Sequence, residues 1–377
     1  MDPIQKLYIE ASTLCNLDCK MCMRRTWQGE PMGHMDMDVY RKVIDEAAGM
    51  DSIHTVFFGG IGEPMFHPQF VEMVRLAKAA GKRVEAVSNG TLINQETAVE
   101  MIEAGLDEVW ISVDGFDEAM YNEIRVYGDF NHVKTNILYL LKLREMPQYA
   151  HFDVGLTFVA MKDNVHQLLD LMKFAWRVGA SDVKVTNILP YSAENVEQAL
   201  YWRTLKEGAF DERKSVQKTG FPRSCHVDFP IMDIRPDTVG ALSHMLGTGN
   251  TFSIMGQPLS RKIGYCRFVQ EGNVFVRWDG EVTQCMALLH PSVTYMHGRQ
   301  RNLLPKSFGS VRTHTLQQVW EDEAYVAFRE KVKKFDFSYC VQCGGCHRLE
   351  SNQEDCFGNE HPTCGACLWA QGFIQCP

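Results

Sequence analysis

Residues 13–24, Thr-Leu-Cys-Asn-Leu-Asp-Cys-Lys-Met-Cys-Met-Arg, decide how the rest of the chain is interpreted. They contain three thiols, Cys15, Cys19 and Cys22, at C-x3-C-x2-C spacing. The alternating apolar stretch before them, residues 7–11, predicts a strand. A loop that leaves the end of a strand can place three sulfurs around one metal ion or one cluster. This stretch therefore predicts a metal or cluster site.

Three thiolates are one ligand short of a tetrahedral zinc site or of a four-cysteine iron–sulfur cluster. The nearest fourth ligand for zinc is His34, which lies beyond the glycine- and proline-containing residues 29–33. A disulfide is not expected, because no signal peptide precedes the motif and the thiols crowd into a short segment. A 4Fe–4S cluster on three cysteines leaves one iron open to a further ligand.

The motif and its place after a first strand resemble the radical S-adenosylmethionine (SAM) enzymes. This chain has Met21 where most members of that family carry an aromatic residue before the third cysteine, and methionine is also apolar and able to cover a cluster. The resemblance implies that Cys15, Cys19 and Cys22 hold a 4Fe–4S cluster. It also implies that the amino and carboxylate groups of SAM chelate the open iron.

Length and composition narrow the remaining choices. A chain of 377 residues with 45% hydrophobic content has room for two or three full-size cores. No apolar run approaches the ~20 residues of a membrane span, and the net charge of −9 argues against a nucleic-acid partner. Thirteen cysteines without a secretory signal indicate a reducing, cytoplasmic location and metal or cluster binding.

Strand-like and helix-like segments alternate through residues 36–195. Strands are expected at residues 7–11, 54–58, 83–87, 107–113, 153–159 and 182–188. Helices are expected near residues 39–48, 69–80, 95–104 and 165–178 and over much of 117–145. This alternation predicts an α/β fold with a parallel sheet. Six such units fit the open, partial (β/α)6 barrel that the radical SAM family has.

Polar residues gather where the expected strands end, which is where α/β proteins place their sites. Residues 59–64, Gly-Gly-Ile-Gly-Glu-Pro, resemble the family's GGE motif, which binds the SAM amino group. The inserted Ile61-Gly62 leaves open which glycine makes the contact, and without the resemblance the segment reads as a tight βα loop. The residues implied are Gly59, Gly60, Gly62, Glu63 and Pro64.

Two later strand ends carry further candidates. Ser88 and Asn89 begin a segment similar to the family's T/S-N-G-T, and they are candidates for the SAM carboxylate or ribose. The alternative there is an Asn-Gly turn followed by a helix N-cap. Ser112 and Asp114 are candidate ribose contacts, with a plain turn as the alternative.

Further candidate SAM contacts are suggested by their position in the chain alone. Arg125 stands where related enzymes often have a cation near the SAM carboxylate, although an exposed helix arginine fits equally well. Asn187 and Leu189, at the end of the sixth strand, are candidates for the adenine region on position alone.

Nine thiols lie from residue 266 onward, after a long interval that contains only Cys225. They are Cys266, Cys285, Cys340, Cys343, Cys346, Cys356, Cys364, Cys367 and Cys376. Asp279-Gly280 between two strand-like runs predicts a hairpin. Gly280 and Cys285 match the G-x4-C of the SPASM extension, which carries auxiliary iron–sulfur clusters in many radical SAM maturases.

The thiol spacing leaves the auxiliary metals open. The run 340–346 resembles a ferredoxin half-motif, whose fourth cysteine precedes a proline, as Cys376 does. The usual SPASM C-x2-C-x5-C-x3-C is not matched. Nine thiols could hold two 4Fe–4S clusters with one cysteine left over, or one 4Fe–4S cluster and one zinc ion. We expect clusters, because a redox enzyme needs a route for electrons. The sequence does not show which cysteines bind which cluster.

The organisation expected is a radical SAM barrel over 1–195, a connecting segment over 196–260 and a SPASM-like domain over 261–377. The resemblance implies that the reduced cluster passes an electron to SAM, which yields methionine and a 5′-deoxyadenosyl radical that removes a hydrogen atom from the substrate. The electron donor expected is a ferredoxin or flavodoxin-type protein. No catalytic side chain is assigned.

The substrate expected is a peptide, a protein or a cofactor. Met286 occupies the position of the catalytic Asp of sulfatase maturases, which argues against that activity. The tail 356–377 and the segments 20–22 and 60–64 resemble maturases associated with tungsten-dependent aldehyde ferredoxin oxidoreductases. This predicts maturation of such an oxidoreductase or of its pterin cofactor.

Two alternatives stay open. One is a peptide maturase that forms thioether or carbon–carbon cross-links. The other is a non-catalytic iron–sulfur electron carrier or zinc-binding adaptor, which would need neither a six-unit barrel nor the Gly59–Glu63 segment beside a three-cysteine loop. The substrate, the cluster count, the oligomeric state and the fate of SAM cannot be derived from the sequence.

Overall fold

The computed structural model describes residues 2–202, 226–230, 232–233, 235–240, 251–254, 264–338, 340–343 and 346–376. In these ranges eleven strands form one sheet, in the order β13-β10-β9-β1-β2-β3-β4-β5-β6-β7-β8. The strands are β1 (Lys6–Ile9), β2 (Thr55–Phe58), β3 (Arg83–Ser88), β4 (Glu108–Ser112), β5 (Asp153–Ala160), β6 (Asp182–Asn187), β7 (His226–Phe229), β8 (Thr251–Ile254), β9 (Asn273–Val276), β10 (Glu281–Thr283) and β13 (Gly309–Ser310).

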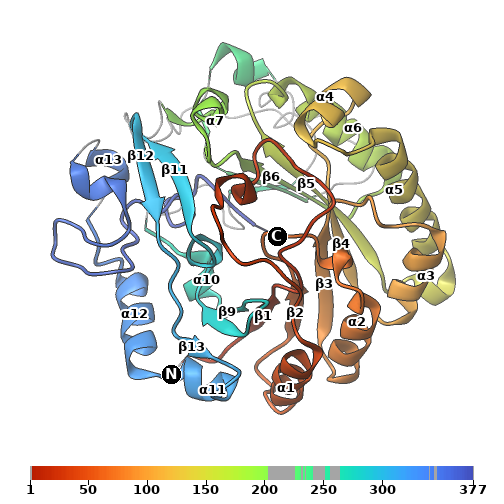
Figure 1. Ribbon diagram of the computed structural model, residues 1–377. Coiled ribbons are helices and arrows are strands. Elements are labelled where there is room, and N and C mark those ends of the chain that lie inside the picture. The colour runs from red at the N-terminus through yellow and green to blue at the C-terminus, as the bar shows by residue number, and fades with distance from the viewer. Residues whose placement is uncertain are drawn as a thin grey trace.

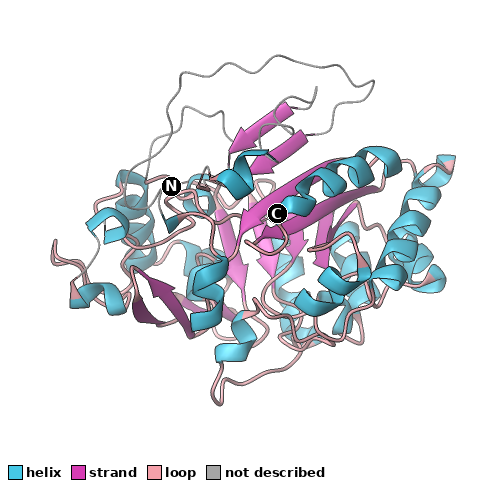
Figure 2. Cartoon of the chain, turned by 90° about the horizontal axis from the view of Figure 1, so that it is seen from above, coloured by secondary structure: helices cyan, strands magenta, loops and turns pink. Residues whose placement is uncertain are grey.

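The first six strands run parallel and lie side by side in chain order. Helices fill the connections between them, and Figure 2 shows these helices on the outside of the curved sheet. They are α1 (Met37–Ala48), α2 (Phe70–Ala79), α3 (Gln95–Glu103), α4 (Glu118–Ile124), α5 (Phe130–Arg144) and α6 (Leu168–Val178). The predicted partial (β/α)6 barrel is therefore confirmed.

Alternation along each strand separates two faces of the sheet. Leu7, Val56 and Val84 are fully buried and belong to the apolar core under the helices. Their neighbours in sequence face the inside of the barrel, because successive strand residues point to opposite sides. Local signals also set where the helices begin: Asp36 caps the N-terminus of α1 by accepting from the backbone N–H groups of Asp38 and Val39.

The sheet continues beyond the barrel at both edges. β7 and β8 extend it next to β6, and β9 pairs in parallel with β1 on the other side. The predicted hairpin joins β9 to the antiparallel β10, and Gly280 takes a positive φ of 90° in its turn. The pairing of β9 with β1 joins residues about 270 positions apart in the sequence. A local sequence pattern cannot predict such a pairing.

The last third of the chain packs against the β9 side of the barrel, as Figure 1 shows. It contains β11 (Ser292–Met296), β12 (Arg299–Leu303), α10 (Arg267–Gln270), α11 (Leu316–Trp320), α12 (Glu323–Lys334) and α13 (Cys340–Cys343). The chain then returns to the barrel, where Asn187 Nδ2 donates to the carbonyl of Phe373 over 2.8 Å. The N–H of Gln375 donates to Thr186 Oγ1 over 3.0 Å.

Most of the expected connecting segment 196–260, with Cys225, lies outside the described residues; its described parts include the end of α7 (Ala193–Gln198), β7 and β8. The three-part division of the chain stays a prediction. Among the helices that the structure describes, none is long and apolar enough to cross a membrane.

Candidate radical SAM site

The three-thiol loop leaves the carboxyl end of β1 and lies over the barrel. A tight turn brings two of its cysteines together, since the N–H of Cys22 donates to the carbonyl of Cys19 over 3.0 Å. The first cysteine is oriented by the backbone, because the N–H of Leu17 donates to Cys15 Sγ over 3.4 Å. The loop is also fixed from α4, since the N–H of Lys20 donates to the carbonyl of Ile124 over 2.9 Å.

The segment 59–64 lies directly against this loop. The N–H of Glu63 donates to the carbonyl of Leu14 over 2.8 Å. A Cβ at Gly62 would come within 2.1 Å of the carbonyl oxygen of Ser12, so only glycine permits this approach. The Ile61-Gly62 insertion thus places the glycine that touches the backbone leading into Cys15. Pro64 begins the short helix η2 (Pro64–Phe66), and the Glu63 side chain caps it by accepting from the N–H of Met65 over 3.2 Å.

Glu63 and Asn89 connect two strand ends to the first thiol. The buried Glu63 carboxylate accepts from the N–H of Asn89 over 2.7 Å. The Asn89 side chain lies 3.6 Å from Cys15 Sγ and donates to Asn16 Oδ1 over 3.0 Å. Burial raises the pKa of Glu63 to about 7, although hydrogen bonds from Asn89 and Ser88 oppose the shift. A buried carboxylate that is linked through Asn89 to the first thiol is a site for a cationic group.

Arg125 and Asp114 form a buried ion pair next to the second thiol. Arg125 Nη2 and Asp114 Oδ2 are 2.6 Å apart, and both side chains are almost completely buried. The other Asp114 oxygen accepts from the N–H of Val159 over 2.7 Å. Arg125 Nη1 lies 4.0 Å from Cys19 Sγ. Asp114 is therefore occupied by protein partners, and Arg125 presents its charge to the thiol.

Two other predicted residues take part in contacts away from the thiol loop. Ser112 accepts a hydrogen bond from Thr157 Oγ1 over 3.1 Å. Asn187 holds the tail through Phe373, as described above. Hydrogen bonds thus join Cys15 to Glu63 through Asn89, and Cys19 to Asp114 through Arg125.

The chemistry of the three thiols fits a cationic cluster. Burial raises the pKa of Cys19 to about 12 and also raises the pKa of Cys22, and the neighbouring thiols contribute to both shifts. Buried thiols with such high pKa values ionise only next to positive charge. Metal ions supply that charge and deprotonate a coordinating thiol outright. The residues present therefore fit an iron–sulfur cluster.

Four cysteines of the C-terminal region form one buried group: Cys266, Cys285, Cys364 and Cys367. Burial raises the pKa of Cys266 to about 12, and the Cys367 thiol acts in the same direction. Burial also raises the pKa of Cys285 and of Cys364, and each is affected by Cys367 and Cys266. The mutual effects place these four thiols in one neighbourhood.

The remaining C-terminal thiols apart from Cys376 are treated as a second group: Cys340, Cys343, Cys346 and Cys356. Cys340 and Cys343 begin and end α13, a single helical turn. Burial raises the pKa of Cys340, and the thiols of Cys356 and Cys346 act in the same direction. In the described ranges no three His, Cys, Asp or Glu side chains converge closely enough to hold a single metal ion. A four-iron cluster needs wider spacing, because each thiolate binds a different iron.

Arg301 on β12 contacts two of the cysteine-bearing segments, and its Nη1 donates to the carbonyl of Ala366 over 3.3 Å. It is buried, donates to the carbonyl of Leu349 over 2.7 Å, and has its pKa lowered by burial to about 10. The thiols of Cys367 and Cys340, one from each group, both oppose that shift. The sequence analysis did not single out Arg301.

Cys376 has different neighbours from the thiols of the two groups. The indole N–H of Trp369 donates to its Sγ over 3.4 Å. Burial raises the pKa of Cys376, and Lys184, Arg267 and Lys6 oppose that shift. Lys184 and Lys6 belong to barrel strands and Arg267 to α10, so Cys376 faces the side of the barrel next to α10.

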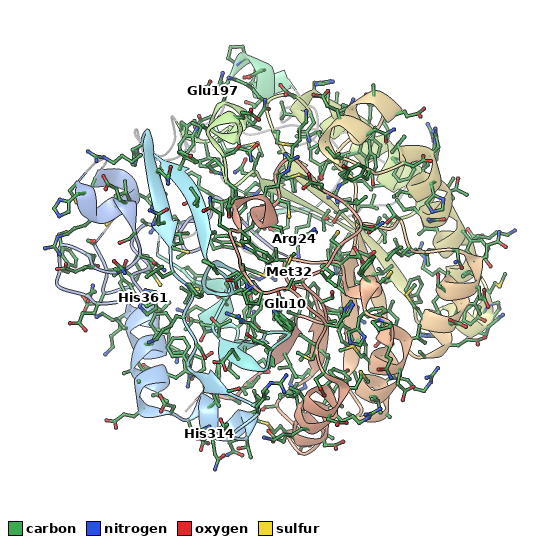
Figure 3. All side chains as sticks on the ribbon, in the orientation of Figure 1. Glu10, Arg24, Met32, Glu197, His314 and His361 are labelled. Carbon is green, nitrogen blue, oxygen red and sulfur yellow. The ribbon has the colours of Figure 1, made fainter. Side chains whose placement is uncertain are left out.

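A buried network that the sequence analysis also missed joins β1 to the C-terminal region. His290 Nε2 lies 2.9 Å from Glu10 Oε2, and His290 Nδ1 lies 2.8 Å from Glu30 Oε1. The N–H of Ile61 donates to Glu10 Oε1 over 3.2 Å, so the network reaches the glycine-rich loop. Figure 3 shows Glu10 and Arg24 over the middle of the barrel. In the sequence, the sign of this network was Glu10, an acidic residue at the end of an apolar strand.

Comparisons with known proteins agree with this geometry. A model of the radical SAM superfamily matches residues 9–175, and a model of the SPASM iron–sulfur cluster-binding domain matches residues 266–347. The chain is 30% identical to the tungsten-containing aldehyde ferredoxin oxidoreductase cofactor-modifying protein of Pyrococcus furiosus, over 98% of this chain and 96% of the relative.

Two further proteins are similar over most of the chain. An AdoMet-dependent heme synthase of Methanosarcina barkeri is 24% identical, over 94% of each chain. The crystal structure of Streptococcus suis SuiB bound to S-adenosylmethionine superimposes with a TM-score of 0.60 at 14% identity. That superposition covers 87% of this chain and 68% of SuiB and shows a common fold. The chain therefore belongs to the radical SAM superfamily and carries its SPASM domain; it is an enzyme that binds SAM, a SAM-coordinating 4Fe–4S cluster and auxiliary iron–sulfur clusters.

Proposed function

We propose that this enzyme uses SAM cleavage to modify the cofactor of a tungsten-containing oxidoreductase. The observation that carries the proposal is the contact between the three-thiol loop, the glycine-rich loop and Asn89 at one end of the barrel. The name of the Pyrococcus relative supports the substrate class. The location proposed is the cytoplasm, with a ferredoxin or flavodoxin-type protein as electron donor.

Each residue of the site has a separate task in this proposal. Cys15, Cys19 and Cys22 hold the cluster, and Glu63 binds the SAM ammonium. When bound, the cluster and SAM supply a one-electron reductive cleavage and, through it, hydrogen abstraction. The buried Arg125–Asp114 pair places a fixed positive charge beside Cys19, where it offsets the negative charge of thiolates.

For the auxiliary clusters we propose the two thiol groups described above as two separate ligand sets. Arg301 then contacts a segment of each set, and Cys376 is left out of both. Two clusters on one side of the barrel provide a route by which an electron reaches or leaves the substrate.

The substrate class is tested by expressing a tungsten-containing oxidoreductase with and without this protein. Mass spectrometry of the extracted cofactor should show a modified form only when the protein is present and its Cys22 is intact. An unchanged cofactor, together with a modified peptide in the same cells, would replace the proposal with peptide maturation.

The role of Glu63 predicts a pH dependence of SAM binding. Only the ionised carboxylate pairs with the SAM ammonium, and the pKa of Glu63 is about 7 because the group is buried. SAM affinity should therefore fall as the pH drops below 7, by about tenfold per unit. The stability of the ligand-free protein should depend on pH in the opposite direction. The protonated Glu63 carboxyl stabilises the fold fully below pH 4.5, the pKa of glutamate in the unfolded chain, and this stabilisation is lost as the pH rises through 7.

Equilibrium dialysis with labelled SAM at several pH values measures this effect. Glu63→Gln should bind SAM roughly ten- to hundredfold more weakly at pH 8, because a charged hydrogen bond is lost. Its affinity should not vary with pH around 7. A variant that keeps the wild-type pH profile would show that Glu63 does not bind the ammonium.

The proposed partition of the auxiliary thiols predicts selective loss of iron. Cys285→Ala removes one ligand from the first group and should lower the iron content by up to four atoms per chain. Cys376→Ala should leave the iron content unchanged. Equal iron losses in the two variants would contradict the partition, and iron analysis after anaerobic reconstitution decides between these results.

A further inference from the structure

The glycine-rich loop, residues 59–64, has two outer anchors on β1 and its continuation. The N–H of Gly59 donates to the carbonyl of Ile9 over 3.1 Å. The N–H of Glu63 donates to the carbonyl of Leu14 over 2.8 Å. Both acceptors are backbone groups, which any amino acid would supply. The centre of the loop, between these two anchors, needs a contact of its own.

The Glu10 side chain supplies that contact. The N–H of Ile61 donates to Glu10 Oε1 over 3.2 Å. A Cβ on Gly60 would lie 2.7 Å from Glu10 Cγ, and Gly60 takes a φ of 146°, so glycine is required where the loop passes this carboxylate. Ile61 belongs to the two-residue insertion in the GGE motif. Glu10 thus anchors the part of the loop that the family motif lacks.

His290, from the C-terminal region, holds the Glu10 carboxylate in turn. His290 Nε2 lies 3.0 and 2.9 Å from the two Glu10 oxygens. Glu10 is 1% exposed and His290 is fully buried, so water does not reach this pair. The other ring nitrogen, Nδ1, lies 2.8 Å from Glu30 Oε1. Loss of His290 would leave the buried Glu10 carboxylate without this counter-charge.

The two carboxylates keep the His290 ring charged. Burial alone lowers the pKa of His290, but the hydrogen bonds to Glu10 and Glu30 outweigh burial and raise it. The nearby Arg277 also opposes ionisation, yet its guanidinium pairs with Asp279 at 2.7 Å. Because ionised carboxylates only accept hydrogen bonds, the ring donates at both nitrogens. The ring therefore fixes the orientation of the Glu10 carboxylate.

The position of His290 is set by the C-terminal region. His290 follows the short helix η5 (Met286–Leu288), which begins directly after Cys285 of the first thiol group. The carbonyl of Leu289, next to His290, accepts from Arg277 Nη1 over 2.8 Å, which fixes this segment to the β9–β10 hairpin. A contact from outside the barrel thus supports the loop that lies against the three thiols.

We propose that Glu10 and His290 are positioning residues that hold the glycine-rich loop in its SAM-binding conformation, so that the C-terminal region completes the SAM site. The inference rests on the proposed function only in that this loop contacts SAM. Both residues act through the N–H of Ile61 and not by contact with SAM. Loss of this anchor should raise the dissociation constant for SAM and leave the cleavage of bound SAM nearly unchanged.

The test compares two replacements of Glu10 of similar size in the reconstituted enzyme. Glu10→Met fills the same space but cannot accept from Ile61, and it should weaken SAM binding about tenfold or more in equilibrium dialysis. Glu10→Gln keeps an oxygen acceptor for Ile61 and an amide that donates to a neutral His290, so it should bind SAM within about threefold of the wild type. At saturating SAM, Glu10→Met should form 5′-deoxyadenosine at close to the wild-type rate.

A double variant separates positioning from stability. Glu10→Met together with His290→Leu replaces the buried ion pair by apolar side chains, a change that folded proteins tolerate. This variant should keep the wild-type iron content and melting temperature and bind SAM as weakly as Glu10→Met alone. His314→Leu is the matched control, because His314 is an exposed histidine of the same region, and Figure 3 shows it away from Glu10. It should bind SAM like the wild type.

SAM binding of wild-type strength by Glu10→Met or by the double variant would overturn the inference. Equal losses in Glu10→Met and Glu10→Gln would also overturn it, because the glutamine keeps the acceptor. Weak binding by the double variant with a lower melting temperature and loss of iron would assign the pair a structural role and contradict the proposal. Glu63→Gln is measured in parallel. Wild-type SAM affinity there, with weakened binding in Glu10→Met, would reject the proposed role of Glu63 and leave this inference standing.

Discussion

Replacing Cys22 with alanine should abolish SAM cleavage. The three thiols of the loop are the complete protein ligand set that we propose for the SAM-coordinating cluster, and a four-iron cluster with only two cysteines is not held. Formation of 5′-deoxyadenosine under dithionite should fall below detection. Iron should drop by about four atoms per chain, because the auxiliary thiol groups are untouched.

Cys376→Ala is the control for this experiment, because Cys376 belongs to none of the proposed ligand sets. Its iron content should match that of the wild type. If Cys22→Ala still formed 5′-deoxyadenosine, Cys22 would not be a ligand and the proposed binding loop would be wrong.

Replacing Asp114 with alanine should destabilise the fold by about 3–5 kcal/mol, because it leaves the Arg125 guanidinium buried without its counter-ion. The Arg125 side chain is 9% exposed and that of Asp114 is fully buried. The substitution also removes the acceptor for the N–H of Val159. Chemical denaturation of the variant and the wild type measures the difference in the free energy of unfolding.

Asp170→Ala provides the comparison, since Asp170 pairs with Lys173 on the exposed side of α6. Exposed pairs contribute about 0–1 kcal/mol, so this variant should unfold almost like the wild type. An Asp114→Ala protein as stable as Asp170→Ala would mean that Arg125 finds another partner or turns to solvent. The charge that we place beside Cys19 would then be absent.

The barrel could be predicted because its signals are local. Each strand and helix of residues 7–178 has its own period of apolar residues, and strict alternation of the two predicts a parallel sheet. The glycine-rich loop was recognised by its resemblance to a family motif. The contact that requires Gly62, the backbone of Ser12, became visible only in three dimensions.

What was missed depends on pairings between distant parts of the chain. The Glu10–His290 contact joins residues 280 positions apart, which no periodicity reveals. The grouping of the nine C-terminal thiols could not be predicted for the same reason. The first group combines two cysteines that precede α11 with two that follow α13.

We propose that this chain holds a SAM-cleaving cluster and two auxiliary clusters. The decisive test is anaerobic reconstitution, followed by measurement of iron and zinc per chain and of 5′-deoxyadenosine formed from SAM under dithionite. We predict about twelve irons, no stoichiometric zinc and formation of 5′-deoxyadenosine. About four irons with one zinc would contradict the auxiliary assignment. A full complement of iron without 5′-deoxyadenosine would contradict the claim itself.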